Sequence, residues 1–189
     1  MQLSRESISR AALGILDEYG LADVTMRRVA STLGVAPGAL YWHIENKQEL
    51  ISAIASLIVS PLIDAPAPCS PAELCTRLRD TLLGHRDGAE VVITAMSQPG
   101  SAVAASLTHL MRAAVERELE GAEMGASTSD RRSAADGLLY MTLGATTVHQ
   151  SASQLAEATG ELPAAGRVAG PEVGPAVSFL VAGLRGGSA

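Results

Sequence analysis

The sequence has few aromatic residues, few cysteines and no long hydrophobic run, and each shortage excludes a class of protein. Aromatic residues are 3% of the 189 residues while apolar residues are 47%, so aliphatic side chains must fill the core. No run of about 18 apolar residues is present, which argues against a membrane span, and the polar N-terminus shows no secretory signal. Cys69 and Cys75 match no zinc-ligand spacing, which favours two small buried side chains in a reducing cytoplasm.

Sequence motifs for catalysis and for metal binding are also missing. The chain holds no nucleophile elbow, phosphate-binding loop, dinucleotide fingerprint or zinc motif. His85, His109 and His149 lie far apart and form no metal-binding pair, so an ordinary surface or core position is the default for each. We therefore expect no catalytic residue, no metal site and no cofactor.

What the sequence does contain is a series of helical patterns without a strand signal. Apolar residues recur at helical spacing over residues 4–19, 25–34, 36–43, 46–60, 101–121 and 129–158, with shorter helices starting at Ser70 and Asp87 and a last one over 177–184. Capping boxes are predicted at Asn46 with Glu49 and at Asp87 with Glu90. Residues 61–71, with four prolines, and the Gly- and Pro-rich residues 160–175 are predicted as loops. These patterns predict an all-α fold.

Residues 25–47 have the pattern of a helix–turn–helix. The Thr25 hydroxyl can cap the first helix, and Gly34 permits the left-handed backbone that ends it. Pro37 suits the first position of a second helix, because its fixed φ is already helical. A Gly-containing turn between two short helices is typical of this motif.

The charge around this motif differs from that of the whole chain. The formal net charge is −6, yet the stretch from Thr25 to Ile44 has two arginines, Arg27 and Arg28, and no acidic residue. A local cationic surface on an acidic protein is compatible with contacts to phosphate groups. Two arginines are equally compatible with an ordinary solvated face.

Residues 5–60 closely resemble the DNA-binding domain of the TetR family of bacterial transcriptional regulators. The matching segments are the helix ending at Tyr19-Gly20, then VTMRRVASTLGV, then PGALYWHIENKQELISAI. The Leu-Tyr-Trp-His segment is especially similar to tetracycline repressors, and a weaker similarity lies in HRDGA at residues 85–89. The resemblance implies a helix-turn-helix DNA-binding domain in residues 1–47, linked through a helix over 46–60 to a helical ligand-binding and dimerisation domain in residues 48–189.

The resemblance also implies which side chains read the bases of double-stranded operator DNA. The recognition helix, residues 36–43, would present Pro37, Gly38 and Ala39 to the major groove. These small groups can pack on thymine methyl groups but cannot make the bidentate contacts that discriminate strongly. Arg27 matches a base-reading arginine, so we expect a guanine contact from it, with a phosphate contact as the alternative.

Other side chains of the motif match family positions that hold the phosphate backbone. Tyr41, Trp42, His43 and Lys47 all carry hydrogen-bond donors for phosphate oxygens. We expect part of Trp42 to pack into the three-helix core as well. Met26 departs from the family, in which a hydroxyl often binds phosphate there, so that contact is lost or supplied by the neighbouring Thr25.

A small-molecule effector is expected in the C-terminal helices. Helical spacing puts Leu138, Thr142, Thr146 and His149 on one face of a helix. It puts Leu107, Leu110 and Met111 on one face of the preceding helix, and a mostly apolar cavity lined by these residues is a plausible binding site. Plain core and dimer contacts are the alternative. In tetracycline repressors a histidine after HRDGA ligates Mg²⁺ with the drug, and the ungapped position here is Val92, which cannot ligate Mg²⁺. We therefore expect an effector other than Mg²⁺-tetracycline.

The helix around residues 137–157 bears on quaternary structure, because it has no charged residue between its ends. A helix without a charged face is normally buried on all sides, by the domain's own core or by a second copy. The resemblance favours a homodimer joined by a four-helix bundle that includes the last helix. It also implies that a ligand changes the separation of the two DNA-reading units, which must match major grooves about 34 Å apart.

Together these expectations describe a ligand-responsive transcriptional regulator, most often a repressor in this family, that binds a palindromic operator as a homodimer. The alternative is a small-molecule carrier or sensor with a vestigial helix–turn–helix and no specific DNA binding. Salt-dependent, sequence-preferring DNA binding separates the two.

Overall fold

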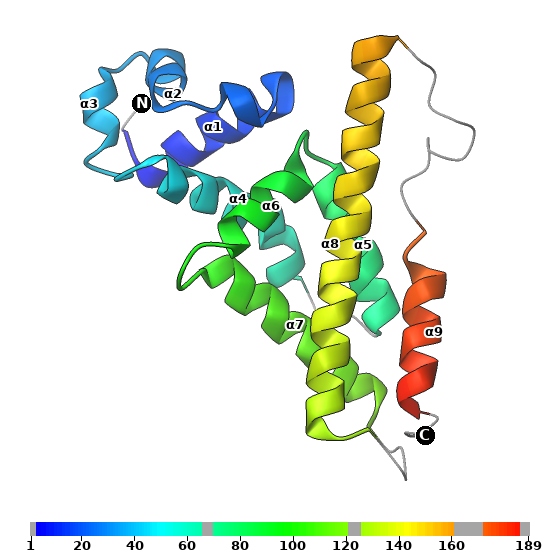
Figure 1. Cartoon of the computed structure of the whole chain (residues 1–189). Helices are drawn as coiled ribbons and strands as arrows, with labels where there is room; N and C mark the ends of the chain where they lie inside the picture. Colours follow the sequence, from blue (N-terminus) through cyan, green and yellow to red (C-terminus); the bar gives the residue numbers. More distant parts are fainter. Residues whose placement is uncertain (1–2, 66–69, 121–125, 161–171, 186–189) are drawn as a thin grey trace.

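The chain folds into helices throughout the part that the structure describes. The computed structural model describes residues 3–65, 70–120, 126–160 and 172–185. A small N-terminal unit contains α1 (Arg5–Tyr19), a 3₁₀ turn over Leu21–Asp23, α2 (Met26–Leu33) and α3 (Pro37–Leu40). The larger body contains α4 (Lys47–Ile63), α5 (Pro71–Leu83), α6 (Gly88–Met96), α7 (Ala102–Glu118), α8 (Thr128–Thr159) and α9 (Gly174–Arg185) (Figure 1). The predicted all-α fold is confirmed.

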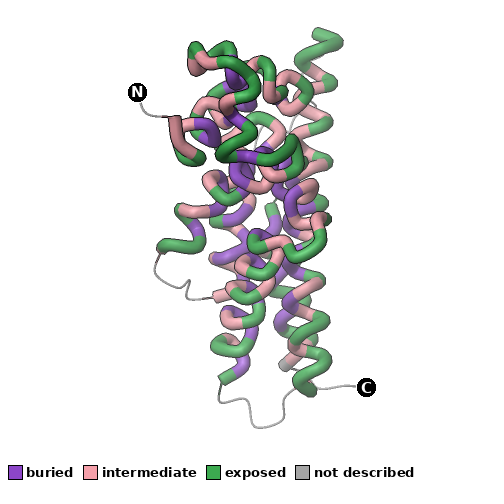
Figure 2. The backbone as a smooth tube through the Cα atoms, turned by 90° about the vertical axis from the view of Figure 1, so that its left-hand side faces the viewer, coloured by how far each residue is buried: buried purple, intermediate pink, exposed green. Residues whose placement is uncertain are grey.

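Helix α4 connects the small unit to the body. Its buried side chains, including Leu50, Ile54 and Ile58, pack against α1 on one side and against α5, α6 and α7 on the other. Figure 2 shows the buried residues running continuously through the interior of the molecule. A movement of the body relative to the small unit must therefore act on α4.

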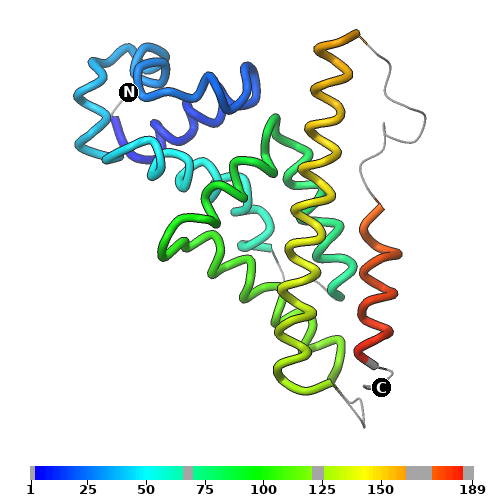
Figure 3. Tube along the Cα trace, in the orientation of Figure 1, coloured from blue at the N-terminus to red at the C-terminus, as the bar shows by residue number. Residues whose placement is uncertain are grey.

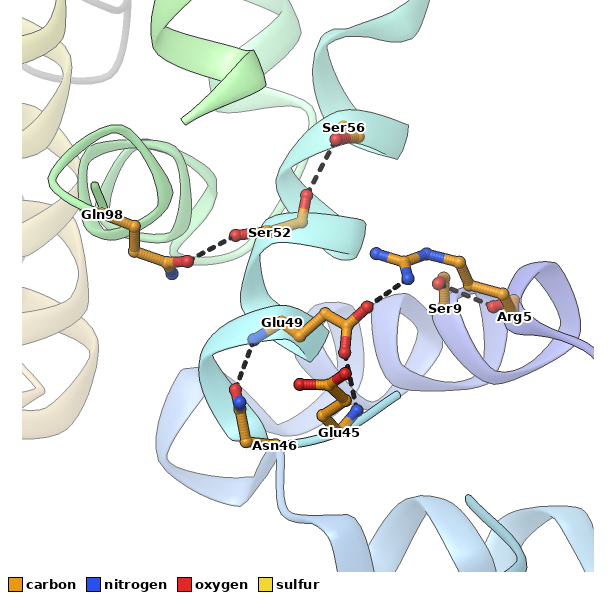
Figure 4. Close-up of polar contacts among 8 residues, drawn as sticks. All are labelled: Arg5, Ser9, Glu45, Asn46, Glu49, Ser52, Ser56 and Gln98. Carbon is orange, nitrogen blue, oxygen red and sulfur yellow. Dashed lines mark hydrogen bonds and ion pairs between the residues drawn. The ribbon is translucent and has the colours of Figure 1, made fainter. Parts of the chain in front are cut away.

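The start of α4 is fixed by polar contacts that differ in part from the predicted capping box. Asn46 caps the helix as predicted, since its side-chain oxygen accepts the Glu49 N–H at 2.9 Å. The Glu49 carboxylate does not return to Asn46; it accepts the Glu45 N–H at 2.6 Å and pairs with Arg5 of α1 (Figure 4). The Glu45 amide and then the Arg5 guanidinium lower the pKa of Glu49.

The predicted capping box of Asp87 and Glu90 is wrong. Asp87 precedes α6 with a left-handed backbone, φ 54°, and its side chain makes no capping bond. Its two carboxylate oxygens instead accept the Leu21 N–H, at 2.7 Å, and the side-chain amide of Gln154 in α8. Asp87 therefore binds residues that are distant in sequence, whereas a capping box would pair it with the backbone of its own helix.

The predicted loop over residues 61–71 is shorter than expected, because α4 continues through Pro61 to Ile63. Proline has no N–H, which leaves the Leu57 carbonyl without its helical donor. The Ser60 hydroxyl donates to that carbonyl at 3.0 Å and so compensates. Residues 66–69, including Cys69, lie outside the described residues, whereas Cys75 is buried as predicted.

The C-terminal boundaries also differ from the prediction. Pro175 lies in the first turn of α9 and not in the predicted loop over residues 160–175, most of which lies outside the described residues. Helix α7 ends at Glu118, and the predicted end at Gly121 is likewise outside them. Within the described ranges, no helix is long and apolar enough to cross a membrane.

The long helix α8 buries one side against α5, α6, α7 and α9 and leaves the other side open. The open side carries a regular series of exposed residues, which we call the α8 stripe: Gly137, Tyr140, Gly144, Val148, Ser151 and Leu155. The stripe is free of charge, as the sequence indicated, but within this chain it is uncovered.

Candidate nucleic-acid interface

The helix–turn–helix is built largely as predicted. Thr25 caps α2 by accepting the Arg28 N–H at 3.1 Å. Gly34 ends α2 with a left-handed backbone, φ 67° and ψ 30°, and Pro37 stands at the start of α3. Buried Leu40 fixes α3 against the core of the small unit. The motif therefore has the backbone geometry that its glycine and proline predict.

The recognition helix is shorter than the predicted range of 36–43. Only Pro37–Leu40 is α-helical, and residues 41–43 form a turn in which the His43 N–H donates to the Leu40 carbonyl at 2.9 Å. The chain leaves the helix at this point so that Ile44 reaches the core, where it is fully buried, before α4 begins. Figure 1 shows α3 at the edge of the small unit farthest from the body.

Most of the predicted DNA-contacting side chains share an exposed surface, which we call the helix–turn–helix surface. It consists of Thr25, Arg27, Pro37, Gly38, Tyr41, Trp42, His43 and Lys47. Ala39 and Met26 are half-buried, and Met26 packs against the core. The prediction that Trp42 packs partly into the core is wrong: it is 89% exposed, and Leu40 and Ile44 fill that core instead.

The two arginines of the acid-free stretch differ in their contacts. Arg28 pairs with Asp23 and lies over the ring of Tyr19, 3.7 Å from its centroid. Arg27 is exposed and makes no ion pair within the part of the chain that the structure describes. Of the two guanidinium groups, Arg27 is therefore the one available for a ligand outside the fold.

The Thr25 hydroxyl can make a second hydrogen bond while it caps α2. As the cap of α2 it accepts a hydrogen bond through oxygen, which leaves its own proton available to donate. The half-buried Met26 thioether next to it has no proton to donate. Thr25 can thus supply the hydroxyl donor that the sequence lacks at position 26.

Six of the seven predicted ligand-binding residues lie in or against the core of the body. Leu107, Met111, Leu138, Thr142 and Thr146 are buried, and Leu110 is half-buried. The two threonine hydroxyls donate to the carbonyls four residues earlier, at 2.8 and 2.7 Å. A part in ligand binding for these residues stays a prediction. Val92, which aligns without gaps to the Mg²⁺-ligating histidine expected in tetracycline repressors, is fully buried.

The seventh residue, His149, lies elsewhere, facing the turn between α5 and α6. There Gln150 donates to the carbonyls of Leu82 and His85, at 3.1 and 2.8 Å, and accepts the Ala89 N–H at 3.0 Å. The sequence reasoning missed this junction, although glutamines four residues apart on a charge-poor helix, Gln150 and Gln154, were a signal. Among the described residues, no three His, Cys, Asp or Glu side chains lie close enough to hold a metal ion.

The short recognition helix, the glycine turn and the exposed donor-rich surface define this chain as a helix–turn–helix protein. The family model described as bacterial regulatory proteins, tetR family, matches residues 8–54. The tetracycline repressor protein class C of Escherichia coli is 31% identical over 173 residues, which are 85% of this chain and 72% of the repressor. The chain belongs to the TetR family of bacterial regulatory proteins, a family of regulators and not of enzymes.

Other relatives match in sequence or in structure. The class D tetracycline repressor of Escherichia coli is 37% identical over 97 residues, 48% of this chain, and the match spans only 44% of the repressor. The crystal structure of BioQ with its double-stranded DNA operator is 34% identical, with a TM-score of 0.78, over 98% of this chain and 100% of BioQ. The similarity to BioQ therefore extends through both the small unit and the body.

Proposed function

We propose that this chain is a ligand-responsive transcriptional repressor that binds a palindromic DNA operator as a homodimer. The observation that carries the proposal is the exposure of the adjacent Tyr41 and Trp42 in the same motif as the exposed cations Arg27 and Lys47. Contiguous exposed apolar side chains in a polar surrounding mark interaction sites. The indole N–H, the phenol and the ammonium group all donate to phosphate oxygens, which explains this combination.

The chemistry of each side chain indicates whether it contacts a base or a phosphate group of the DNA. Pro37 and Gly38 can approach the bases closely but offer no directional hydrogen bond from a side chain. Arg27, which has no ion-pair partner in the described chain, is positioned at the start of α2 to contact a base or a phosphate. We propose the guanine contact for Arg27 and phosphate contacts for Tyr41, Trp42 and Lys47.

The homodimer is proposed from the α8 stripe and the outer face of α9. Tyr140, Val148 and Leu155 are each more than 60% exposed, and Phe179 of α9 is 80% exposed. Small residues of the stripe alternate with these large ones, so that a second copy related by a two-fold axis could interlock with the first. A four-helix bundle of α8 and α9 with their symmetry mates would bury this surface.

The domain division and the response to a ligand are also proposed here. We propose that residues 1–47 read DNA and that residues 48–189 bind the effector and dimerise, with α4 transmitting the change. Two relatives are named tetracycline repressors, which supports repression by a ligand-responsive protein. Buried Val92, without a metal-ligating atom, supports an effector other than Mg²⁺-tetracycline.

The experiment that tests the proposal is operator binding as a function of salt. Genomic fragments bound by the purified chain are sequenced, and the enriched site is titrated at several salt concentrations. A palindromic site whose affinity falls steeply with salt supports the repressor. If no sequence is preferred even at low salt, the chain is a carrier or sensor with a vestigial motif. Release of the complex by a candidate metabolite tests the effector separately.

A further inference from the structure

A cavity of about 450 Å³ lies in the body, next to the turn that contacts the small unit. Its walls come from the α5–α6 turn, residues 83–87, and from the C-terminal part of α8, residues 149–157. Figure 3 shows this turn between the end of α1 and the upper part of α8. We call it the hinge cavity, because the turn that forms one wall also contacts the small unit, through Asp87 with Leu21 and through His85 with Asp17.

The frame of the hinge cavity is rigid. Gln150 uses both amide protons and one acceptor site to hold the turn, through the three bonds to backbone groups described above. Gly88 at the end of the turn lies so close to Leu82 that a Cβ atom would stand 2.4 Å from the Leu82 carbonyl oxygen. The cavity is thus a preformed feature of the fold and does not depend on a mobile side chain.

Several polar side chains of the cavity have no partner within the described chain. Arg86, His149 and Ser153 offer donors there, while Glu157 at the rim offers a carboxylate. The other carboxylate of the wall, Asp87, is already occupied by the Leu21 N–H and the Gln154 amide. The available groups are therefore three donors and one acceptor.

We propose that the hinge cavity binds a small organic anion that carries hydroxyl groups. The acidic group of the ligand accepts hydrogen bonds from Arg86, His149 and Ser153, and its hydroxyl groups donate to Glu157. Charge-assisted bonds from a guanidinium group are among the strongest polar contacts available to such a site. This ligand class differs from the mostly apolar one that the α7–α8 pattern suggested.

The position of the cavity gives the ligand a route to the DNA-binding unit. Gln154 on the cavity wall holds Asp87, and Asp87 holds the Leu21 N–H directly after α1. The Arg86 guanidinium also lies beside the end of α1, with Nε 3.2 Å from the place of a Cβ on Gly20. A ligand bound to Arg86, the residue before Asp87, acts on the turn that holds Leu21; this coupling rests on the proposed function.

The cavity stays accessible in the proposed homodimer. Its residues on α8, from His149 to Glu157, lie on a different face of the helix from Val148, Ser151 and Leu155 of the α8 stripe. A second copy seated on the stripe therefore does not cover the cavity.

The test is an NMR titration of the full chain with glycerol 3-phosphate at fixed pH and ionic strength, without DNA. The imidazole signals of His149 and His85 should shift and saturate, while that of His109, exposed on α7, should stay unchanged. Propyl phosphate, which lacks the hydroxyl groups, should bind several-fold more weakly. In Glu157→Gln this preference should shrink.

Arg86→Gln and Arg132→Gln form the matched pair of variants, since both remove one exposed cation and Arg132 lies at the far end of α8. Arg86→Gln should weaken glycerol 3-phosphate binding about tenfold, and Arg132→Gln should leave it within about twofold. An unmoved His149 signal, or equal losses in the two variants, would overturn the site. Failure of operator binding would leave this titration intact, so the two proposals fail separately.

Discussion

Two surfaces of this chain expose large apolar side chains, and they differ in the charge around them. The helix–turn–helix surface exposes Trp42 and Tyr41 together with the cations Arg27 and Lys47. On the α8 stripe, the helix carries no charged residue between Asp136 and Glu157, a length of more than five turns. Exposure alone therefore does not identify a partner. The cations favour a polyanion on the first surface, and their absence favours an apolar copy on the second.

An arginine placed in the α8 stripe should have the largest effect. In a two-fold dimer Leu155→Arg adds two like charges to one apolar interface, and such juxtaposition costs several kcal/mol. Sedimentation should show the dimer dissociating at least about 100-fold more readily, with operator affinity falling in parallel. Ala105→Arg, on the exposed side of α7 outside the stripe, is the control and should remain dimeric. An unchanged dimer in Leu155→Arg would remove the stripe from the interface.

Removing single cations from the helix–turn–helix surface should distinguish a side chain that contacts a base from one that contacts a phosphate group. Arg27→Ala should cost about 1–3 kcal/mol of operator affinity and relax the preference at one base pair. Lys47→Ala should weaken all sequences alike and lower the salt slope by about 1. Competition binding against a library of single-base operator variants measures both. If Arg27→Ala lowers affinity without changing base preference, Arg27 is a phosphate contact.

Removing the exposed indole should affect DNA binding but not folding. Because Trp42 is 89% exposed, Trp42→Ala should change the free energy of unfolding by less than about 0.5 kcal/mol. Operator affinity should fall by about 1 kcal/mol through the lost hydrogen bond. Leu40→Ala, at a fully buried position next to it, should instead cost about 2–5 kcal/mol of stability. Denaturant unfolding of both variants decides between a partner-binding and a packing function for Trp42.

The smallest expected effect concerns the Glu49 carboxylate, which contacts the Glu45 N–H and Arg5 at the start of α4. The pKa of Glu49 is lowered in the folded state, chiefly by the Glu45 N–H and then by Arg5. The carboxylate therefore stabilises the fold at neutral pH, and this contribution is lost as pH falls below about 4. Glu49→Gln should lower the thermal midpoint slightly at pH 7, and this difference should shrink as the pH is lowered below about 4. An equal effect in both pH ranges would exclude the charge as the cause.

The helix–turn–helix could be predicted because its signals are local. Thr25, Gly34 and Pro37 each set the backbone within a few residues of themselves, and the structure agrees at all three. The exposed location of Lys47 at the start of α4 also follows from a local cap, Asn46. Where the cause of a structure is close in sequence, residue types and their spacing are enough.

The remaining features depend on contacts between distant segments. Asp87 has the sequence of a capping residue, yet its partners Leu21 and Gln154 lie more than 60 residues away on either side. The hinge cavity likewise forms only when the α5–α6 turn meets α8. Trp42 was expected in the core because size and apolarity favour burial, but Leu40 and Ile44 already fill the space. The spacing of residue types along the sequence does not show which distant segments come into contact.

The proposed repressor function depends most directly on the binding of operator DNA by the helix–turn–helix surface. The decisive measurement is selection of bound genomic fragments by the purified chain, followed by titration of the enriched site with the wild type and Arg27→Ala. We predict a palindrome with half-sites about one helical turn apart, or a multiple of it, and a loss of preference at one position of each half-site in Arg27→Ala. If the bound fragments share no common sequence and both proteins bind them equally, the helix–turn–helix surface does not read operator DNA.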